Sequence, residues 1–221
     1  MRPEQYDAWY ATCRGAWIGD EEYRLLESLL DPRRGETLLD VGCGTGYFTR
    51  RFASGGAVGA VVGADLDRDA LRFAAAHSSR DIGFVAADAR RLPFRDRSFD
   101  VVISVTALCF VREEQQALRE MLRVARRRVA LGLLNHRSLL YVLKGRGGGK
   151  GAYRGARWHT PKAVAQLFNG LPARESGWRT AIMSPQGGKW SRRAEPRLRK
   201  IFPGLGAFIA AAADVAPGTD G

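Results

Sequence analysis

The sequence predicts an α/β fold built on a doubly wound, mostly parallel sheet. Short apolar runs, of the length that buried parallel strands require, alternate with segments that have the apolar spacing of helices. The chain has 221 residues, of which 45% are hydrophobic, and this is enough for one substantial core. We therefore expect residues 1–221 to form a single domain with one sheet and one site.

Each expected element rests on one of these two patterns. The predicted strands lie at 37–41, 60–64, 82–86, 101–105 and 129–134, and two further strand candidates lie at 178–183 and 205–213. The predicted helices lie at 21–30, 47–53, 69–77, 113–127 and 161–168. Because helices separate the first five strands, they should cover both faces of the sheet. The basic stretch 185–200 is expected to link the last two strands.

Two segments depart from this alternation. Residues 1–20 are rich in Tyr and Trp and have little helical periodicity, so we expect an aromatic arm. Residues 135–160 contain a short apolar helix candidate at 138–143, followed by the stretch Gly-Arg-Gly-Gly-Gly-Lys-Gly. Because glycines loosen the backbone, this segment is expected to be a mobile, basic insertion.

The positive charge is concentrated in one part of the chain. The net charge is +12, and residues 112–200 carry 21 Lys and Arg against five Asp and Glu. Such a stretch could attract an anionic substrate, a nucleic acid or a membrane surface, or it could form a solvated, Arg-rich surface.

The composition favours a cytoplasmic protein without a structural metal. The first residues carry charges where a secretory signal needs an apolar stretch, and the run 205–213 is too short to cross a bilayer. Cys13, Cys43 and Cys109 are scattered and form no Cys-x-x-Cys pattern. We therefore expect neither disulfides nor structural zinc, and no metal at the site.

A glycine loop follows the first predicted strand. The stretch Leu-Leu-Asp-Val-Gly-Cys-Gly-Thr-Gly at 38–46 places three alternate glycines between an apolar strand and a helix. Glycines let the backbone turn sharply and let a ligand approach closely. A dinucleotide fingerprint needs a third glycine at position 47, where Tyr47 stands, so the spacing differs from that motif.

Carboxylates follow the next two strands. Asp65 ends the second strand, nineteen residues beyond Gly46, where a ribose-binding acid belongs. Asp88 follows the third strand and could accept a hydrogen bond from an adenine amino group. Ligands of open α/β sheets bind outside the carboxyl ends of the strands, so these side chains should meet at one edge.

Taken together, residues 36–134 resemble the class I S-adenosylmethionine-dependent methyltransferases, in particular the type 11 branch. The motifs are Leu-Asp-Val-Gly-Cys-Gly-Thr-Gly, Gly-Ala-Asp-Leu-Asp, Ala-Asp-Ala-Arg-Arg-Leu-Pro-Phe and Ser-Phe-Asp-Val-Val-Ile-Ser. The resemblance implies a Rossmann-like, seven-stranded sheet of order 3-2-1-4-5-7-6 whose last strand is antiparallel. It also implies S-adenosylmethionine as cofactor and S-adenosylhomocysteine as product. A nucleotide-free or NAD-binding Rossmann domain is the alternative.

The resemblance also implies the residues that hold the donor. It puts Asp40, Gly42, Gly44 and Gly46 around the methionine moiety, Asp65 on the ribose, Leu66, Asp88 and Ala89 at the adenine, and Val105 beside the donor. By likeness to methyltransferases with an amino-terminal segment over the donor, residues 1–20 would form a lid. Arg14 and Trp17 would then contact the donor, and 135–160 would cover the acceptor pocket.

The acceptor is less well defined by the sequence. An in-line displacement depends mainly on positioning, so a general base is optional; His136, His159 and Tyr153 are the candidates. No Asn/Asp-Pro-Pro-Tyr motif follows the fourth strand, and this favours a small O, N or S nucleophile over a nucleic acid. The concentrated charge suggests an anionic acceptor. The alternatives are a methyltransferase acting on RNA through residues 112–200 and a non-enzymatic donor-binding protein.

Overall fold

The computed structural model of the chain describes residues 2–216. The strands are β1 Glu36–Val41, β2 Val58–Asp65, β3 Gly83–Ala86, β4 Phe99–Val105, β5 Ala125–Leu134, β6 Ala173–Ala181 and β7 Phe208–Val215. The helices are α1 Pro3–Ala11, α2 Cys13–Leu30, α3 Tyr47–Ser54, α4 Arg68–Ala76, α5 Glu114–Val124, α6 Pro161–Leu167 and α7 Lys189–Ile201. Short helical turns are η1 Leu108–Phe110, η2 Tyr141–Gly145, η3 Arg146–Gly148 and η4 Gly151–Tyr153.

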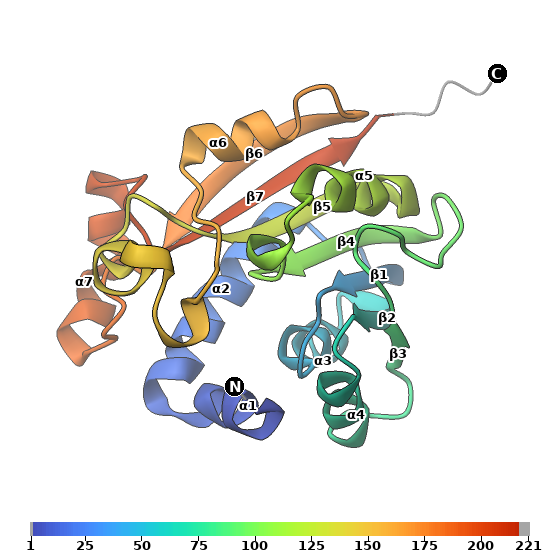
Figure 1. Cartoon of the computed structure of the whole chain (residues 1–221), viewed down its shortest axis with the longest axis horizontal. Helices are drawn as coiled ribbons and strands as arrows, with labels where there is room; N and C mark the ends of the chain where they lie inside the picture. Colours follow the sequence, from blue (N-terminus) through green and yellow to red (C-terminus); the bar gives the residue numbers. More distant parts are fainter. Residues whose placement is uncertain (1, 217–221) are drawn as a thin grey trace.

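The strands form one seven-stranded sheet of order β3-β2-β1-β4-β5-β7-β6 (Figure 1). The pairs from β3 to β5 are parallel, and β7 runs antiparallel to both of its neighbours. The predicted fold class, strand order and antiparallel last strand are all confirmed.

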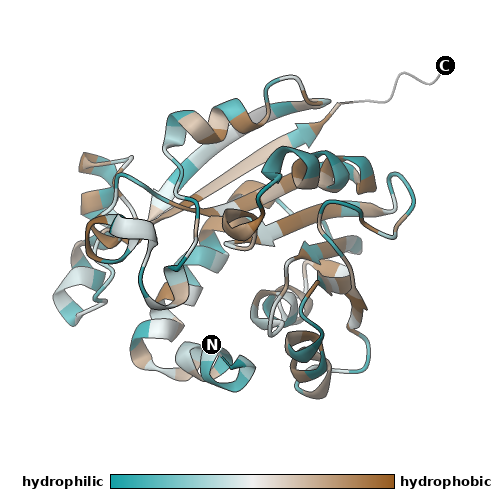
Figure 2. Ribbon diagram, viewed as in Figure 1, coloured by the Kyte–Doolittle hydropathy of each residue, from teal (hydrophilic) through white to brown (hydrophobic). Residues whose placement is uncertain are grey.

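Successive residues of the central strands face opposite layers of the core. Leu38 and Val101 pack on the face covered by α2 and α3, whereas Leu39 and Val102 pack on the face covered by α5 and α6. This follows from the two-residue repeat of a strand, and the near-continuous apolar runs supply both faces. Figure 2 shows hydrophobic residues concentrated along the strands and hydrophilic ones on the outer side of α5.

The amino-terminal aromatic arm is helical, although its sequence has little helical periodicity. Thr12 separates α1 from α2, and its hydroxyl accepts a hydrogen bond from the Gly15 amide at 3.0 Å. A Cβ at Gly15 would lie 2.0 Å from the Trp9 carbonyl oxygen, and one at Gly19 would lie 2.4 Å from the Tyr47 hydroxyl. Between residues 3 and 19 the buried positions are Tyr10, Gly15, Ile18 and Gly19, so aliphatic residues at helical spacing are almost missing from this part of the chain.

The stretch 185–200 is also more regular than predicted, because most of it forms α7. Glu195 is buried on this helix and accepts hydrogen bonds from the amides of Ile182 and Met183, at 2.6 and 2.9 Å. These bonds fasten α7 to the chain just after β6. The stretch does join β6 to β7 as expected, but the helix within it was not predicted, because Pro196 and the run of arginines obscure the helical pattern.

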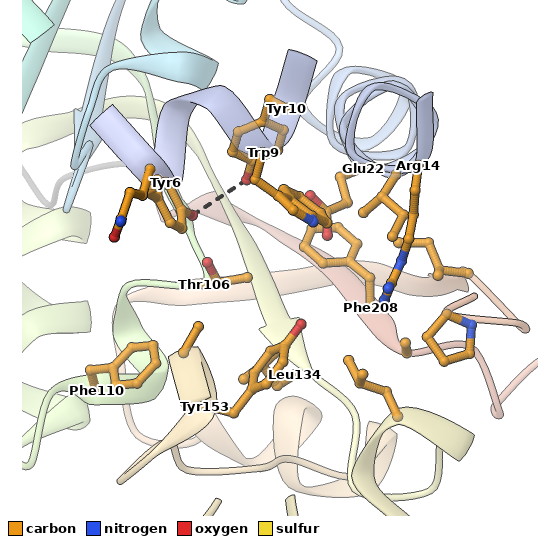
Figure 3. A pocket seen from close by; sticks show the side chains of 17 residues that line it. Tyr6, Trp9, Tyr10, Arg14, Glu22, Thr106, Phe110, Leu134, Tyr153 and Phe208 are labelled. Carbon is orange, nitrogen blue, oxygen red and sulfur yellow. Dashed lines mark hydrogen bonds between the residues drawn. The ribbon is translucent and has the colours of Figure 1, made fainter. Parts of the chain in front are cut away.

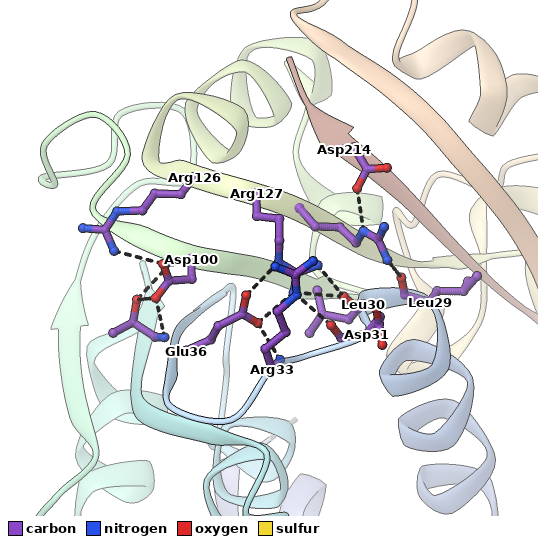
Figure 4. Close-up of polar contacts among 11 residues, drawn as sticks. Leu29, Leu30, Asp31, Arg33, Glu36, Asp100, Arg126, Arg127 and Asp214 are labelled. Atoms are coloured by element: carbon purple, nitrogen blue, oxygen red, sulfur yellow. Dashed lines mark hydrogen bonds and ion pairs between the residues drawn. The ribbon is translucent and has the colours of Figure 1, made fainter. Parts of the chain in front are cut away.

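The predicted helix 113–127 ends early, and its last arginines belong to β5. Arg127 binds both carboxylate oxygens of Glu36 at 2.7 Å and donates to the Asp31 carbonyl at 2.9 Å (Figure 4). Arg128 binds Asp214 at 2.6 Å and donates to the Leu29 carbonyl at 3.0 Å. These contacts tie the end of α2 to three strands at the amino end of β5. Part of the concentrated positive charge is therefore structural.

Residues 135–160 are a series of short helical turns, and backbone hydrogen bonds join them to the sheet. The His159 amide donates to the Leu134 carbonyl, and the Arg157 amide donates to the Cys109 carbonyl, at 2.8 and 2.7 Å. The predicted mobility of this insertion stays a prediction. Within residues 2–216, no helix has the length and apolar character needed to cross a membrane.

The contacts of Arg127 predict its effect on stability. Replacing Arg127 with Met should lower the free energy of unfolding by about 1–3 kcal/mol, because it leaves a poorly exposed carboxylate unpaired. Arg126→Met is the matched control, since Arg126 is half exposed and binds Asp100 at 3.1 Å. Its loss should cost under about 1 kcal/mol. Urea unfolding measures both, and equal losses would contradict this account.

Candidate active site

Three connected pockets lie outside the carboxyl ends of the parallel strands. The Asp65 pocket has a volume of about 310 Å³ and the glycine-loop pocket about 150 Å³. The third, which we call the aromatic pocket, has a volume of about 420 Å³. Phe110 lines all three, and Tyr6, Tyr10 and Thr106 line both the glycine-loop pocket and the aromatic pocket. A ligand spanning the first two pockets would therefore end against the third.

The glycines of the loop have backbone angles that favour glycine. Gly42, Gly44 and Gly46 have φ of +75°, +53° and +78°. A Cβ at Gly42 would lie 2.2 Å from the Ala107 side chain, whereas one at Gly44 would project into open space. Gly42 and Gly44 line the glycine-loop pocket, and Gly46 caps α3 outside it. The loop thus leaves free volume where a ligand can approach the backbone.

Asp40 lines the glycine-loop pocket and has one buried carboxylate oxygen without a partner among residues 2–216. Its Oδ2 accepts a hydrogen bond from the Thr49 hydroxyl at 2.7 Å, and its Oδ1 has no partner among residues 2–216. Burial, assisted by the charge of Asp65, raises the pKa of Asp40 to about 7. A buried oxygen without a partner is costly, so the site favours a ligand that brings a cationic donor.

Asp65 shapes the loop and also lines its own pocket. Its Oδ2 accepts from the Gly44 amide at 2.7 Å, and its Oδ1 accepts from the Asp67 amide at 2.8 Å. Each oxygen keeps a further lone pair for a ligand hydroxyl. Leu66 beside it is 72% exposed, which leaves a flat apolar surface for a ring to pack on.

The other predicted donor residues divide between the two donor-side pockets. Asp88 and Ala89 line the Asp65 pocket, and Val105 lines the glycine-loop pocket. Arg90 binds Asp88 through Nε at 3.0 Å and Nη2 at 2.7 Å, and these bonds lower the pKa of Asp88. The sequence analysis did not single out Arg90, although its position two residues after Asp88 permits this contact.

The aromatic pocket is enclosed by the amino-terminal helices on one side and the insertion on the other (Figure 3). Its lining includes Tyr6, Trp9, Tyr10, Arg14, Glu22, Thr106, Phe110 and Tyr153. The Tyr6 and Tyr10 hydroxyls are 3.3 Å apart, and the Tyr10 ring stacks on Tyr47 with centroids 3.6 Å apart. Asp7 also binds Arg50 at 2.6 Å. These contacts hold α1 against α3.

Of the three predicted general-base candidates, the structure brings only Tyr153 to the aromatic pocket. Burial raises the pKa of Tyr153 to about 12, so its phenol is protonated at neutral pH. His159 is buried outside the three pockets, with Nε2 3.0 Å from a Glu114 carboxylate oxygen. His136 also lies outside them and packs on the Tyr141 ring.

The two predicted lid residues also separate. Arg14 lines the aromatic pocket and lies outside the glycine-loop pocket, away from the place expected for the donor carboxylate. Trp17 lies outside the three pockets, where it packs on Gly187 and under the Arg192 guanidinium, 5.5 Å from the ring centroid. The aromatic arm therefore lines the site mainly through Tyr6, Trp9 and Tyr10.

Thr106 and Glu22, like Arg90 and Phe110, were not among the predicted site residues. Thr106 adopts φ +57° directly after β4, a conformation that is uncommon for a residue with a Cβ, at the boundary of two pockets. Glu22 lines the aromatic pocket at 9% exposure, and burial raises its pKa to about 8. In the sequence, Glu22 is an acid on an otherwise apolar helix face, one turn after Ile18 and one turn before Leu26, and this pattern could have identified it.

This geometry agrees with a family comparison. Residues 39–131 match the family model Methyltransf_11, described as a methyltransferase domain. That segment contains the glycine loop, Asp65, Asp88 and β4. Residues 39–131 therefore match a methyltransferase domain, and S-adenosylmethionine is the cofactor of the class I methyltransferases. The predicted class and cofactor are confirmed.

Individual relatives match the same segment. An uncharacterised chloroplastic methyltransferase of Arabidopsis thaliana is 35% identical over 115 residues, which are 48% of this chain and 33% of the relative. The ubiquinone/menaquinone biosynthesis C-methyltransferase UbiE of Ectopseudomonas mendocina is 43% identical over 98 residues, 42% of this chain and 38% of the relative. These alignments thus span under two fifths of the length of the curated relatives.

A solved structure extends the likeness in fold to nearly the whole chain. A S-adenosylmethionine-dependent methyltransferase of Thermotoga maritima, described as a possible histamine N-methyltransferase, superposes with a TM-score of 0.74. The match covers 96% of this chain and 95% of that one at 20% identity, so it concerns the fold alone.

The donor-side residues fit this cofactor. The unpaired Oδ1 of Asp40 suits the ammonium group of the methionine moiety, and the free lone pairs of Asp65 suit the ribose hydroxyls. The exposed face of Leu66 suits the adenine ring. Among residues 2–216, no group of three or more His, Cys, Asp or Glu side chains has the arrangement of a metal site.

The role of Asp65 can be tested through donor binding. Asp65→Ala should weaken the binding of S-adenosylhomocysteine by about 1.5–3 kcal/mol for each charge-assisted hydrogen bond lost. The Gly44 amide also loses its acceptor, which adds to the effect. Asp69→Ala, at an exposed position on α4, is the control and should bind normally. Unchanged affinity of Asp65→Ala in titration calorimetry would exclude this assignment.

The burial of Glu22 predicts a pH-dependent stability. The folded chain keeps the Glu22 proton up to about pH 8, whereas an unfolded chain releases it near 4.5. The contribution of Glu22 to the free energy of unfolding is complete below about pH 4.5, and it is lost as the pH rises through about 8. Glu22→Gln should therefore be more stable than the wild type at pH 8.5, by up to roughly 5 kcal/mol, and similar at pH 5.

Urea unfolding at both pH values measures this difference. Glu4→Gln, which changes an exposed acid on α1, is the control and should track the wild type throughout. An equal difference in the free energy of unfolding between Glu22→Gln and the wild type at both pH values would show that Glu22 ionises normally.

Proposed function

We propose that this chain transfers the methyl group of S-adenosylmethionine to an O, N or S atom of a small molecule bound in the aromatic pocket. The observation that carries the proposal is the wall shared by the aromatic and glycine-loop pockets, made of Tyr6, Tyr10, Thr106 and Phe110. The volume of the aromatic pocket, about 420 Å³, and its largely apolar lining are typical of small-molecule sites.

Positioning is the main catalytic contribution in this proposal. When bound, the cofactor supplies a methyl group on a sulfonium, which reacts by in-line displacement. Asp40 would hold its ammonium group and Asp65 its ribose hydroxyls, and both residues lie on the donor side of the shared wall. Tyr6, Tyr10 and Phe110 present aromatic rings there, which favour a cation and exclude water. Holding two reactants in line contributes several kcal/mol, up to about 7–11.

Two segments of the chain contribute side chains to the aromatic pocket. Residues 1–20 contribute through α1 and the first half of α2, and residues 135–160 contribute Leu140, Ala152 and Tyr153. We infer that both segments act as lids, and that α1, held by the Tyr10 stack and the Asp7–Arg50 ion pair, is the part that opens. Tyr153 would then donate a hydrogen bond to the acceptor.

The charge of the described residues bears on the choice of acceptor. Several arginines of the basic stretch are paired with acids; these are Arg123, Arg126, Arg127, Arg128, Arg157 and Arg199. This pairing lowers the charge available to RNA and so favours the small-molecule proposal. Arg14, at the aromatic pocket, is the residue that would bind an anionic substituent of the acceptor. Cytoplasmic location stays a prediction.

Labelled donor provides the test. Incubating the chain and methyl-labelled S-adenosylmethionine with a metabolite extract should label a small molecule, which mass spectrometry identifies. Gly44→Val, which fills the space at the glycine loop, should give no label. EDTA should leave the labelling intact, since we propose that no metal takes part. Label confined to RNA, with affinity that falls steeply with salt, would replace this proposal with the RNA alternative.

A further inference from the structure

Glu22 is a buried carboxyl with no structural partner. Its neighbour Glu21 binds Arg199 at 2.8 Å, and Glu27 on the same helix accepts from the Tyr23 hydroxyl at 2.7 Å. Glu22 itself is 9% exposed and makes no hydrogen bond or ion pair within residues 2–216. An amide or apolar side chain would fill the same place without the cost of burying an acid, so packing gives no reason for a carboxyl here.

The surroundings of Glu22 suit an organic cation. It lines the aromatic pocket together with Tyr6, Trp9, Tyr10 and Tyr153, and Figure 3 shows Tyr153 entering from the other side of the pocket. Aromatic ring faces attract cations, and a carboxylate adds a full negative charge beside them. The combination binds alkylammonium groups well because both parts favour the same charge.

The other titratable and charged groups at this pocket do not neutralise Glu22. Tyr6, Tyr10 and Tyr153 are phenols, and burial raises the pKa of each, so they are uncharged near neutral pH. Arg14 lines the pocket but is exposed, and no ion pair joins it to Glu22 within the described part of the chain. Glu22 is therefore available to a ligand.

We propose that the methyl acceptor is a primary or secondary amine with an apolar body, and that Glu22 binds its nitrogen and accepts its proton. This inference rests on the proposed methyltransferase function. A protonated Glu22 with a neutral amine, and a carboxylate with an ammonium ion, differ only in the position of one proton. Either way the pair carries no net charge, so its burial is less costly than that of either ion alone.

The chemistry balances with Glu22 in this role. An ammonium ion gives one proton to the Glu22 carboxylate, which frees the nitrogen lone pair. That pair forms the new N–CH₃ bond, while the electrons of the breaking S–CH₃ bond stay on sulfur as the thioether. The methylated amine keeps its remaining protons as an ammonium ion, and Glu22 returns its proton to water when the pocket opens. No oxidant, reductant or metal is needed.

Matched amines and alcohols test the proposal. Benzylamine, 2-phenylethylamine and tryptamine would each be titrated against the corresponding alcohol, with the protein saturated in S-adenosylhomocysteine. At least one amine should bind the wild type about tenfold or more tightly than its alcohol, the size of one charge-assisted hydrogen bond. Glu22→Gln should reduce that preference to about onefold, and Glu4→Gln should leave it unchanged.

Two further measurements test the role of the Glu22 carboxylate. Calorimetry in two buffers of different protonation enthalpy should detect proton exchange on amine binding in the wild type, and Glu22→Gln should lose part of it. Glu22→Asp keeps the charge and should keep part of the preference for amines. If Glu22→Gln does not fold, Glu22→Asp and Glu22→Ala decide by the same comparison.

The outcomes separate this inference from the function on which it rests. Failure of the wild type to bind S-adenosylhomocysteine would overturn the proposed function. Normal binding of S-adenosylhomocysteine, with no amine preferred over its alcohol, would overturn the amine proposal alone. A preference for amines that survives in Glu22→Gln would also overturn the role of Glu22.

Discussion

The arrangement of the site depends on one hydrogen bond between the loop after β1 and the last residue of β2. The Gly44 amide donates to Asp65, so the loop after β1 is fixed by a carboxylate at the end of β2. Because the strands are parallel neighbours, a short loop suffices to bring these groups together. The bond leaves the loop open at Gly44 and leaves Asp65 with free lone pairs. The two donor-side pockets form on either side of it.

The sequence predicted those parts of the molecule that depend on local pattern. The strands, the glycine loop and the carboxylate of Asp65 follow from residues whose pattern is local, whereas the strand order and the role of Asp40 were implied by the resemblance to the methyltransferase family. Glu22 could not be placed, because its importance arises from α1 and the insertion, which meet around it only in the fold. His159 was misplaced for the same reason, since its partner Glu114 lies 45 residues away.

Charged side chains play different parts at the two ends of the sheet. At the amino end of β5, arginines pair with Glu36 and Asp214 and hold α2 to the sheet (Figure 4). At the carboxyl end of the strands, Asp40 and Asp65 face the pockets. The linings of the two donor-side pockets contain acids and no Lys or Arg, and Arg14 is the basic residue at the aromatic pocket.

Phe110 has a consequence for how the ligands of the site affect one another. Its ring borders all three pockets, so a ligand in any one of them contacts a side chain that also bounds the other two. A donor packed against this ring would restrict it and so would fix part of the wall of the aromatic pocket. The two ligands would then be thermodynamically linked, each tightening the other by the same factor. Such coupling would follow from one shared side chain, without any large movement of the sheet.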